Sequence, residues 1–528
     1  MTRNNLARVL VVVAAAFVPF ARGLANGFVW DDQVVVGRRL APAGCGGLSD
    51  VWQQPYWGQG FGPRDTYRPL SLSLLYLERR AFGMAAAPYR AVGLGLHAAV
   101  SVLVLAVLGR LAGARVGLAS ALLFAAHPVH AEAVATVYGQ LELVAALFVL
   151  ATVGLYARAR HDGVQPWPFV LAVACAAAAA CSKESALMLP ALLMLVRAAW
   201  LVEDGDGEGD GGSAAWARRF ARGLGWDVLF VLAAVPYLML RYRALGHLLP
   251  EPEATITLGY TFAQRVKAVV IAVGEAVRLC TLPTGQGLYY GHLRGSLYGW
   301  PYAELTWVAA GALLAVWLGG ERGRRAALFG AGWFLVALFP VMNFIPTGVL
   351  VAERTLYMPS LGVCFLAAAW LGPLSRGAAG SALAGLVLAG AAAGATVVGN
   401  WRDQETLWRT TIAAHPSSPL AHLSIGQVLV DHWQNSGAVP SPAELDEAAA
   451  AFDAAYRLNP GLTRALVGRG VVAARQGDRA RAEQLLRRAV AAAPDDPVPR
   501  AALRALLDGA RAHAGPGRDV GGPDPADP

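Results

Sequence analysis

Four groups of polar residues interrupt a chain that is otherwise rich in apolar runs, and their residue types and spacing could support chemistry. The first group is the acid pair Asp31 and Asp32, directly after Trp30. A positioned carboxylate is a suitable general base for taking a proton from an acceptor hydroxyl. The plainer alternative is a solvated pair of loop acids, although acids at a membrane boundary are costly unless water or cations reach them.

The second group closes an apolar run and contains His127, His130 and Glu132. Two histidines and a glutamate invite a metal site. Their spacing does not place all three on one helical face, however, and Pro128 interrupts the helix. We therefore rank a hydrogen-bonded structural role above metal binding, and dependence on a divalent metal stays open.

The other two groups carry cations. Lys183 and Glu184 lie in a short turn that could reach the outer headgroup layer, and their plainer interpretation is an ion pair within the protein. Glu353, Arg354 and Tyr357 open a later apolar segment. The Arg354 guanidinium could hold a phosphate through forked hydrogen bonds. Alternatively, Arg354 and Tyr357 anchor the segment at the membrane interface.

Membrane-spanning helices are the elements that must position these groups. Hydrophobic residues make up 56% of the 528 residues and charged residues only 15%, whereas soluble domains carry about a quarter charged residues. The net charge of +8 comes from arginines that flank apolar runs, which favours loop positioning over nucleic-acid binding. We predict eleven spans, at residues 7–24, 88–108, 116–134, 138–157, 167–182, 185–202, 224–242, 303–320, 326–343, 357–374 and 380–399.

Lysines and arginines in short loops orient the spans with the N-terminus inside. We interpret the first span as a retained anchor and not a cleaved signal peptide, because no convincing small-residue cleavage site follows it. The long outside loop at 25–87 then contains a predicted interfacial helix at 70–77. The five cysteines show neither a CxxC pair nor metal spacing, so no structural disulfide framework is predicted.

The apolar stretch at 260–282 contains four charged residues. A lipid-facing charge at mid-bilayer costs roughly 2.5–3.5 kcal/mol, so we predict an amphipathic helix on the outer surface and not a span. The basic cluster at 321–325 and the flexible Gly- and Asp-rich loop at 203–222 then lie inside, and the chain from residue 400 onward lies outside.

The C-terminal part repeats itself with a period of 34, the length of a tetratricopeptide repeat. Gly470 and Gly477 fall where that repeat has a tight helix contact and a turn, and an insertion is expected at 435–442. The organisation predicted is a membrane domain at 1–400, repeats at 401–513 that dock or bind a partner, and a disordered tail at 514–528. The recurring set is Ala448, Phe452, Ala455 and Pro460, followed by Ala482, Leu486, Ala489 and Pro494.

Five ordered strings resemble the transmembrane and tetratricopeptide repeat-containing O-mannosyltransferases and their bacterial relatives. The chain departs from that family at Gly139-Gln140-Leu141-Glu142, where the family usually shows Gly-Arg and then an acid. The repeats are also fewer than in the long animal members. The matching strings are Phe28-Val29-Trp30-Asp31-Asp32, Tyr67-Arg68-Pro69-Leu70, His127-Pro128-Val129-His130-Ala131-Glu132-Ala133-Val134, Ser182-Lys183-Glu184 and Val351-Ala352-Glu353-Arg354-Thr355-Leu356-Tyr357-Met358-Pro359-Ser360.

The resemblance implies an all-α, polytopic GT-C glycosyltransferase domain followed by a short repeat solenoid. It implies transfer of a sugar, mannose in this family, from a polyprenyl-phosphate carrier to a hydroxyl acceptor on protein, at the non-cytoplasmic face of the cytoplasmic membrane. Asp31 or Asp32 would be the base, with a lean to Asp31. Arg354 would bind the donor phosphate, assisted by Lys183 or Arg68. Two alternatives remain: a transferase acting on a glycan or lipid, and a non-catalytic platform that recruits partners.

Overall fold

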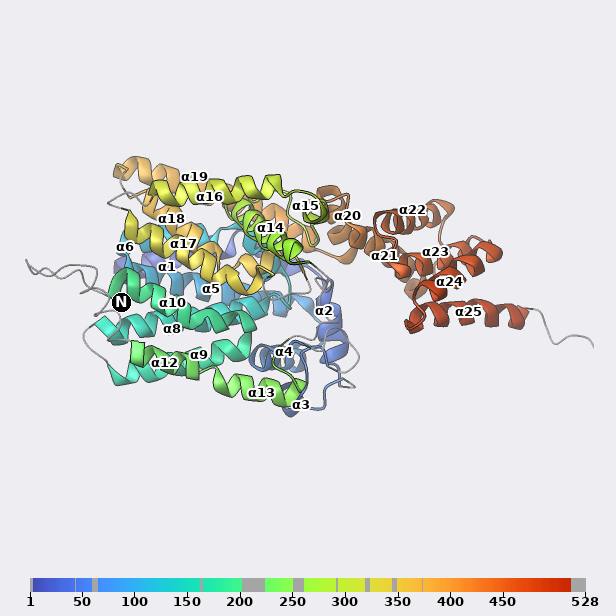
Figure 1. Cartoon of the computed structure of the whole chain (residues 1–528), viewed down its shortest axis with the longest axis horizontal. Coiled ribbons are helices and arrows are strands. Elements are labelled where there is room, and N and C mark those ends of the chain that lie inside the picture. Colours follow the sequence, from blue (N-terminus) through green and yellow to red (C-terminus); the bar gives the residue numbers. More distant parts are fainter. Residues whose placement is uncertain are drawn as a thin grey trace, which may run out of the picture. The chain divides into compact units, whose positions relative to one another are not determined.

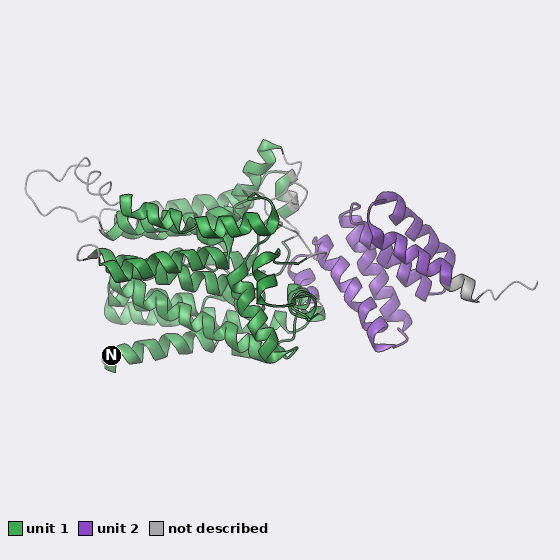
Figure 2. Ribbon diagram, turned by 90° about the horizontal axis from the view of Figure 1, so that it is seen from below, with its two compact units in different colours: residues 1–407 green, residues 408–528 purple. Residues whose placement is uncertain are grey.

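The computed structural model describes residues 3–42, 44–58, 65–161, 165–201, 224–249, 261–290, 293–318, 323–343, 349–372 and 374–513. The chain forms two compact units, residues 1–407 and 408–528, which Figure 2 shows in different colours. The division lies close to the boundary predicted at residue 400. The predicted inside loop at 203–222, the start of the basic cluster at 321–322 and the tail at 514–528 lie outside the described residues.

The described part of the chain is built from helices and contains no strand, so the predicted all-α fold is confirmed. In the first unit, long helices run side by side, and α2, α3 and α4 lie at the end of the bundle opposite to the N-terminus (Figure 1). The helices are α1 (Arg3–Phe17), α2 (Asp31–Val34), α3 (Leu48–Gln53), α4 (Pro69–Phe82), α5 (Ala86–Leu111), α6 (Ala114–Ala125), α7 (Ala131–Ala135), α8 (Gln140–His161), α9 (Pro166–Ser182), α10 (Leu189–Val196), α12 (Leu224–Leu232), α13 (Val235–Leu245), α14 (Phe262–Thr281), α15 (Leu293–Tyr298), α16 (Tyr302–Leu318), α17 (Arg324–Leu338), α18 (Ser360–Trp370) and α19 (Arg376–Val397).

Several of these helices have apolar outer surfaces that suit a lipid environment. Large apolar side chains such as Val228, Val316 and Leu388 are exposed, which suits a hydrocarbon surrounding better than water. Five helical stretches among the described residues are long and apolar enough to cross a membrane, at 86–111, 140–160, 224–245, 324–341 and 376–401. The chain is therefore a membrane protein.

The number of crossings stays a prediction, although each of the eleven predicted segments overlaps a helix among the described residues. Helices α6 and α7 would form a sixth crossing if they make one span, and they are bent by 52°. Pro128 lies at the break, as expected for a residue without an amide hydrogen. Helix α14, which covers the stretch at 260–282, is not among the helices that meet the criterion for a span.

The second unit is a row of antiparallel helices. A Cβ atom at Gly426 would come within 2.8 Å of the Phe452 ring, and one at Gly470 within 2.8 Å of Leu486, so both helix pairs pack closely at a glycine. Gly477 has a φ of +84° and makes the turn that follows. The helices are α20 (Gln404–Ala414), which begins in the first unit, α21 (Pro419–Ser436), α22 (Pro442–Leu458), α23 (Thr463–Arg475), α24 (Arg479–Ala492) and α25 (Pro497–His513).

The spacing of these contacts agrees with the repeat pattern. Phe452 and Leu486 are 34 residues apart, whereas Gly426 and Gly470 are 44 apart. The ten extra residues therefore lie between Gly426 and Phe452. In this interval, the loop at 437–441 separates α21 from α22. The identity of these helices as tetratricopeptide repeats stays a prediction.

Candidate active site

A strained turn presents the two adjacent acids of the loop that follows α1. Trp30 has a φ of 48°, a left-handed value that costs a non-glycine residue on the order of 1–3 kcal/mol. Helix α2 begins immediately afterwards at Asp31. Because neighbouring residues on a helix point about 100° apart, the two carboxylates meet different surroundings. Asp32 is fully buried, whereas Asp31 is only partly buried.

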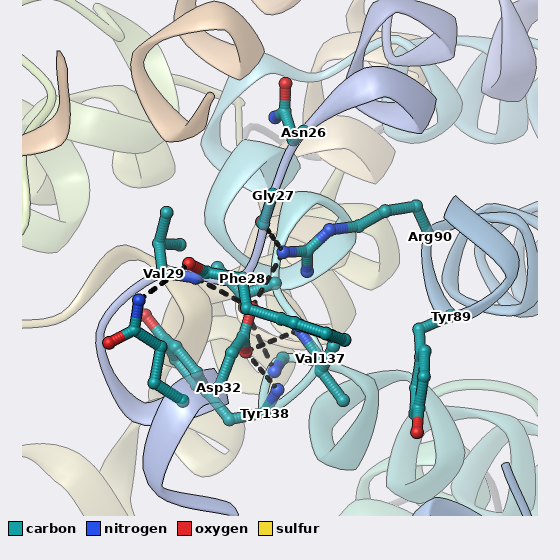
Figure 3. A network of polar contacts seen from close by, with 12 residues as sticks. Asn26, Gly27, Phe28, Val29, Asp32, Tyr89, Arg90, Val137 and Tyr138 are labelled. Atoms are coloured by element: carbon teal, nitrogen blue, oxygen red, sulfur yellow. Dashed lines mark hydrogen bonds and ion pairs between the residues drawn. The ribbon is translucent and has the colours of Figure 1, made fainter. Parts of the chain in front are cut away.

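Asp32 joins three distant segments of the chain (Figure 3). Its Oδ1 accepts hydrogen bonds from the backbone amides of Val137 at 2.7 Å and Tyr138 at 3.1 Å. Its Oδ2 forms an ion pair with Arg90 of α5 at 2.7 Å. Arg90 also donates to the carbonyl of Gly27, just before the acid pair. These contacts engage both carboxylate oxygens, so the position of Asp32 is that of a structural anchor for the loop.

Asp31 keeps a partly exposed carboxylate. Burial raises the pKa of Asp31 to about 6, with Arg354 opposing the shift and Asp32 and Glu132 adding to it. A base is most effective when its pKa lies near the operating pH. Of the two candidate acids, Asp31 therefore has the surroundings that suit proton transfer.

Arg354 lies within electrostatic range of Asp31 and is held by a carboxylate from another segment. Its guanidinium forms an ion pair with Glu132, and its backbone amide donates to the other Glu132 oxygen at 2.8 Å. The guanidinium also lies over the Tyr138 ring, 5.2 Å from its centroid. Since the Arg354 side chain is still 21% exposed, it can reach a ligand without leaving Glu132.

Arg68 lies in the loop before α4. Its Nε donates to Glu184 at 2.8 Å, so Glu184 forms an ion pair within the protein, with Arg68 and not with its neighbour Lys183. Arg241 of α13 lies 3.6 Å from the other Glu184 oxygen. Burial opposes ionisation of Glu184, but Arg68, the hydrogen bonds to the carboxylate and Arg241 together lower the pKa of Glu184.

Lys183 pairs with Glu142, in the first turn of α8. Burial, together with Arg68 and Arg354, lowers the pKa of Lys183 well below its ordinary value. Both residues line a cleft whose other walls are mostly apolar. These walls come from α8, α10, α17 and the segment around Thr355, and include Ala145, Val149, Leu192, Ala337, Val341 and Met358.

The remaining predicted residues stabilise the structure behind the site. His127 Nε2 lies 3.1 Å from the Cys280 carbonyl oxygen, and His130 Nε2 lies 2.8 Å from the Ser360 hydroxyl. The Tyr357 hydroxyl is hydrogen-bonded to His97. The described residues contain no group of three or more His, Cys, Asp or Glu side chains arranged to hold a metal ion.

Glu353 holds the loop that follows α14. It accepts hydrogen bonds from the Gln286 amide at 2.6 Å, the Gly287 backbone at 2.8 Å and the Tyr290 hydroxyl. Burial raises the pKa of Glu353 to about 8. Tyr289, the residue before Tyr290, makes an edge-to-face contact with Trp30 at 5.9 Å, so this loop borders the turn that carries Asp31.

The contacts of Arg90, Glu142 and Arg241 were not predicted from the sequence. Arg90 and Arg241 lie within predicted apolar spans, and a charged residue inside such a span is by default a functional candidate. Glu142 appeared only as part of the altered string at 139–142.

The fold and the site define a membrane protein in which a partly exposed carboxylate, Asp31, lies within electrostatic range of Arg354 and Arg68. Similar curated proteins are protein O-mannosyl-transferases. Human Protein O-mannosyl-transferase TMTC4 is 27% identical over 485 residues, with 81% of this chain and 65% of the human protein covered. Protein O-mannosyl-transferase F38B6.6 of Caenorhabditis elegans is 23% identical over 444 residues, with 81% and 61% covered.

The resemblance inferred from the five strings is thus confirmed, and the chain spans just under two thirds of the length of these relatives. No protein-family model matches the chain. The crystal structure of ArnT from Cupriavidus metallidurans bound to undecaprenyl phosphate has a TM-score of 0.45 to this chain at 16% identity, with 90% of this chain and 79% of ArnT covered. A TM-score below 0.5 leaves the two folds only loosely comparable.

Proposed function

We propose that this chain is a membrane glycosyltransferase that moves a sugar, expected to be mannose, from a polyprenyl-phosphate carrier to a hydroxyl group on an acceptor protein. The observation that carries the proposal is the placement of the partly exposed Asp31 within electrostatic range of Arg354 and Arg68. An acid to activate the acceptor and cations to hold a phosphate are the two components this transfer needs. The relatives named Protein O-mannosyl-transferase support the same reaction.

The chemistry assigns one role to each side of the site. Asp31 takes the proton of the acceptor hydroxyl as its oxygen forms a bond to the anomeric carbon of the sugar. The bond between that carbon and the phosphate oxygen breaks, and the carrier leaves as a phosphate anion. Arg354, with Lys183 and Arg68, stabilises this anion. Because phosphate is already the leaving group, the reaction needs no nucleotide.

The cleft beside Lys183 supports a lipid carrier as the donor. Its polar end contains Lys183 and Glu142, and its apolar wall continues along α8 to Val149. Seven residues of helix correspond to about 10 Å. An isoprenoid chain attached to a phosphate near Lys183 could therefore continue between apolar side chains towards the bilayer.

The purified protein in nanodiscs should transfer radiolabelled mannose from polyprenyl-phosphate mannose. Label in protein would support O-mannosylation, whereas label in a lipid or glycan fraction would favour the other transferase. A variant with Asn at both Asp31 and Asp32 that retains the function would favour the platform. Absence of transfer by the wild-type protein to any acceptor would overturn the enzymatic proposal.

We infer that the site faces the non-cytoplasmic side of the cytoplasmic membrane, together with the repeats at 401–513, which would guide the acceptor protein. The parity of eleven spans and an inside N-terminus support this orientation. Reporter enzymes fused after residue 420 should be active only outside the cytoplasm. Activity restricted to the cytoplasm would reverse the assignment.

A further inference from the structure

Tyr56, which was not among the predicted site residues, lies close to the charged residues of the candidate site. Tyr56 is in the loop between α3 and α4, where its backbone amide donates to the Thr66 carbonyl at 2.7 Å. This hydrogen bond turns the chain back towards Arg68. The Arg68 guanidinium lies over the Tyr56 ring, 5.6 Å from its centroid, and Trp57 packs edge-on against the ring at 4.9 Å. The ring is therefore held on two sides.

The hydroxyl of Tyr56 is buried and has no hydrogen-bond partner among the residues that the structure describes. Leaving a buried donor unpaired is costly, so its position calls for a ligand or a water molecule as partner. Burial is the main reason that the pKa of Tyr56 is raised well above its ordinary value. The hydroxyl thus keeps its proton at any physiological pH and remains a donor.

The two arginines near this hydroxyl make an anion a suitable partner for it. Tyr56 lies within electrostatic range of Arg68 and Arg354, and also of the acids Asp31 and Asp32. The three predicted phosphate-binding cations already have carboxylate partners: Glu184 for Arg68, Glu142 for Lys183 and Glu132 for Arg354. A phosphate that binds among these ion pairs gains from a hydroxyl donor that has no partner among the described residues.

We propose that Tyr56 is a substrate-binding residue whose phenolic hydroxyl donates a hydrogen bond to the phosphate of the lipid-linked donor, an inference that rests on the proposed function. The hydrogen bond persists in the product, because the departing carrier keeps the phosphate. Tyr56 therefore binds both the sugar-loaded carrier and the free polyprenyl phosphate.

The test compares Tyr56→Phe with Tyr89→Phe in the full-length protein in nanodiscs. Phe at position 56 keeps the ring under Arg68 and removes only the hydroxyl. Tyr89 is a matched control: it is buried in the same apolar cluster, but its hydroxyl donates to the Gly83 carbonyl at 3.0 Å. Three quantities are measured for each variant: the KM for the donor, the affinity for long-chain polyprenyl phosphate alone, and the Tm.

We expect Tyr56→Phe to raise the donor KM and the Kd for polyprenyl phosphate about tenfold, as for one lost hydrogen bond to a charged group. The Tm should not fall, since the hydroxyl makes no hydrogen bond to the part of the chain that the structure describes. Tyr89→Phe should lower the Tm and leave both affinities unchanged. An unchanged donor KM in Tyr56→Phe, or a fall in its Tm like that of the control, would overturn the inference.

The wild-type measurements separate this inference from the proposed function. If the wild-type protein binds polyprenyl phosphate but transfers no sugar, the proposed function is wrong, and the Kd of the Tyr56→Phe variant still decides the role of the hydroxyl. If transfer is observed and Tyr56→Phe has the wild-type donor KM, the function stands and the role of Tyr56 does not. If the wild type binds neither the donor nor polyprenyl phosphate, both the proposed function and the role of Tyr56 are wrong.

Discussion

Replacing Asp31 should impair catalysis without weakening the fold, whereas replacing Asp32 should weaken the fold. Asp31→Asn removes the proposed base and should lower the rate of transfer about 10²–10⁴-fold. Its folding should not suffer, because burial disfavours the charge that is removed. A carboxyl whose pKa is raised on folding destabilises the protein as pH rises through that pKa, so the Tm of Asp31→Asn at pH 7 should equal or exceed that of the wild type.

Asp32→Asn should instead weaken the fold. An Asn side chain can still accept from the Val137 amide through Oδ1, but it brings an N–H group against Arg90. Breaking one partner of a buried ion pair leaves the other charge uncompensated and costs about 3–5 kcal/mol. Thermal unfolding in nanodiscs, followed by tryptophan fluorescence, would measure this loss.

The pH profile provides an independent measurement on the wild type. Asp31 must be ionised to act as a base, so kcat/KM should fall as pH falls through about 6. The ionised fraction changes from about nine tenths at pH 7 to about one tenth at pH 5, which predicts a loss of about tenfold. Wild-type turnover by Asp31→Asn, or wild-type stability of Asp32→Asn, would refute the assignment of roles.

Three further outcomes follow from the same contacts. Arg354→Ala should raise the donor KM more than Arg354→Lys, because a lost charge-assisted hydrogen bond costs roughly 1.5–3 kcal/mol; equal KM values in both variants and the wild type would remove Arg354 from the phosphate site. Ala145→Trp should fill the cleft and raise the KM for long-chain but not short-chain donors, and an equal effect on both would exclude the cleft from carrier binding. Gly468→Ala should destabilise the repeats by about 1–3 kcal/mol, since its Cβ would lie 2.3 Å from the Phe452 ring. Limited proteolysis should show no such change for the exposed Gly461→Ala, and equal protection of both variants would contradict the packing argument.

The helical architecture could be predicted because it depends on local patterns. Apolar length predicted helices at all eleven segments, and the charges at 260–282 indicated an amphipathic α14, which is not among the helices long and apolar enough to span. Pro128 marked the bend between α6 and α7 for a purely local reason. The 34-residue period of the sequence predicted a close helix contact at Gly470 and a turn at Gly477, and the structure has both.

The candidate residues were predicted as a set, but their partners were not. The chain order alone suggests that Lys183 pairs with its neighbour Glu184, whereas the structure pairs Lys183 with Glu142 and Glu184 with Arg68. An ion pair forms between whichever charges packing brings within a few ångströms, and these partners are 41 and 116 residues apart. No local pattern contains that information.

The difference between Asp31 and Asp32 shows where local information ends. Their order and polarity sufficed to predict an acidic site in the first outside loop, because adjacent acids are rare beside an apolar span. Which carboxylate stays available depended on Arg90 and on the backbone amides of Val137 and Tyr138, all supplied by other helices or turns. Burial and hydrogen bonding are properties of the packed chain, so only the tertiary structure could distinguish an anchoring acid from a candidate base.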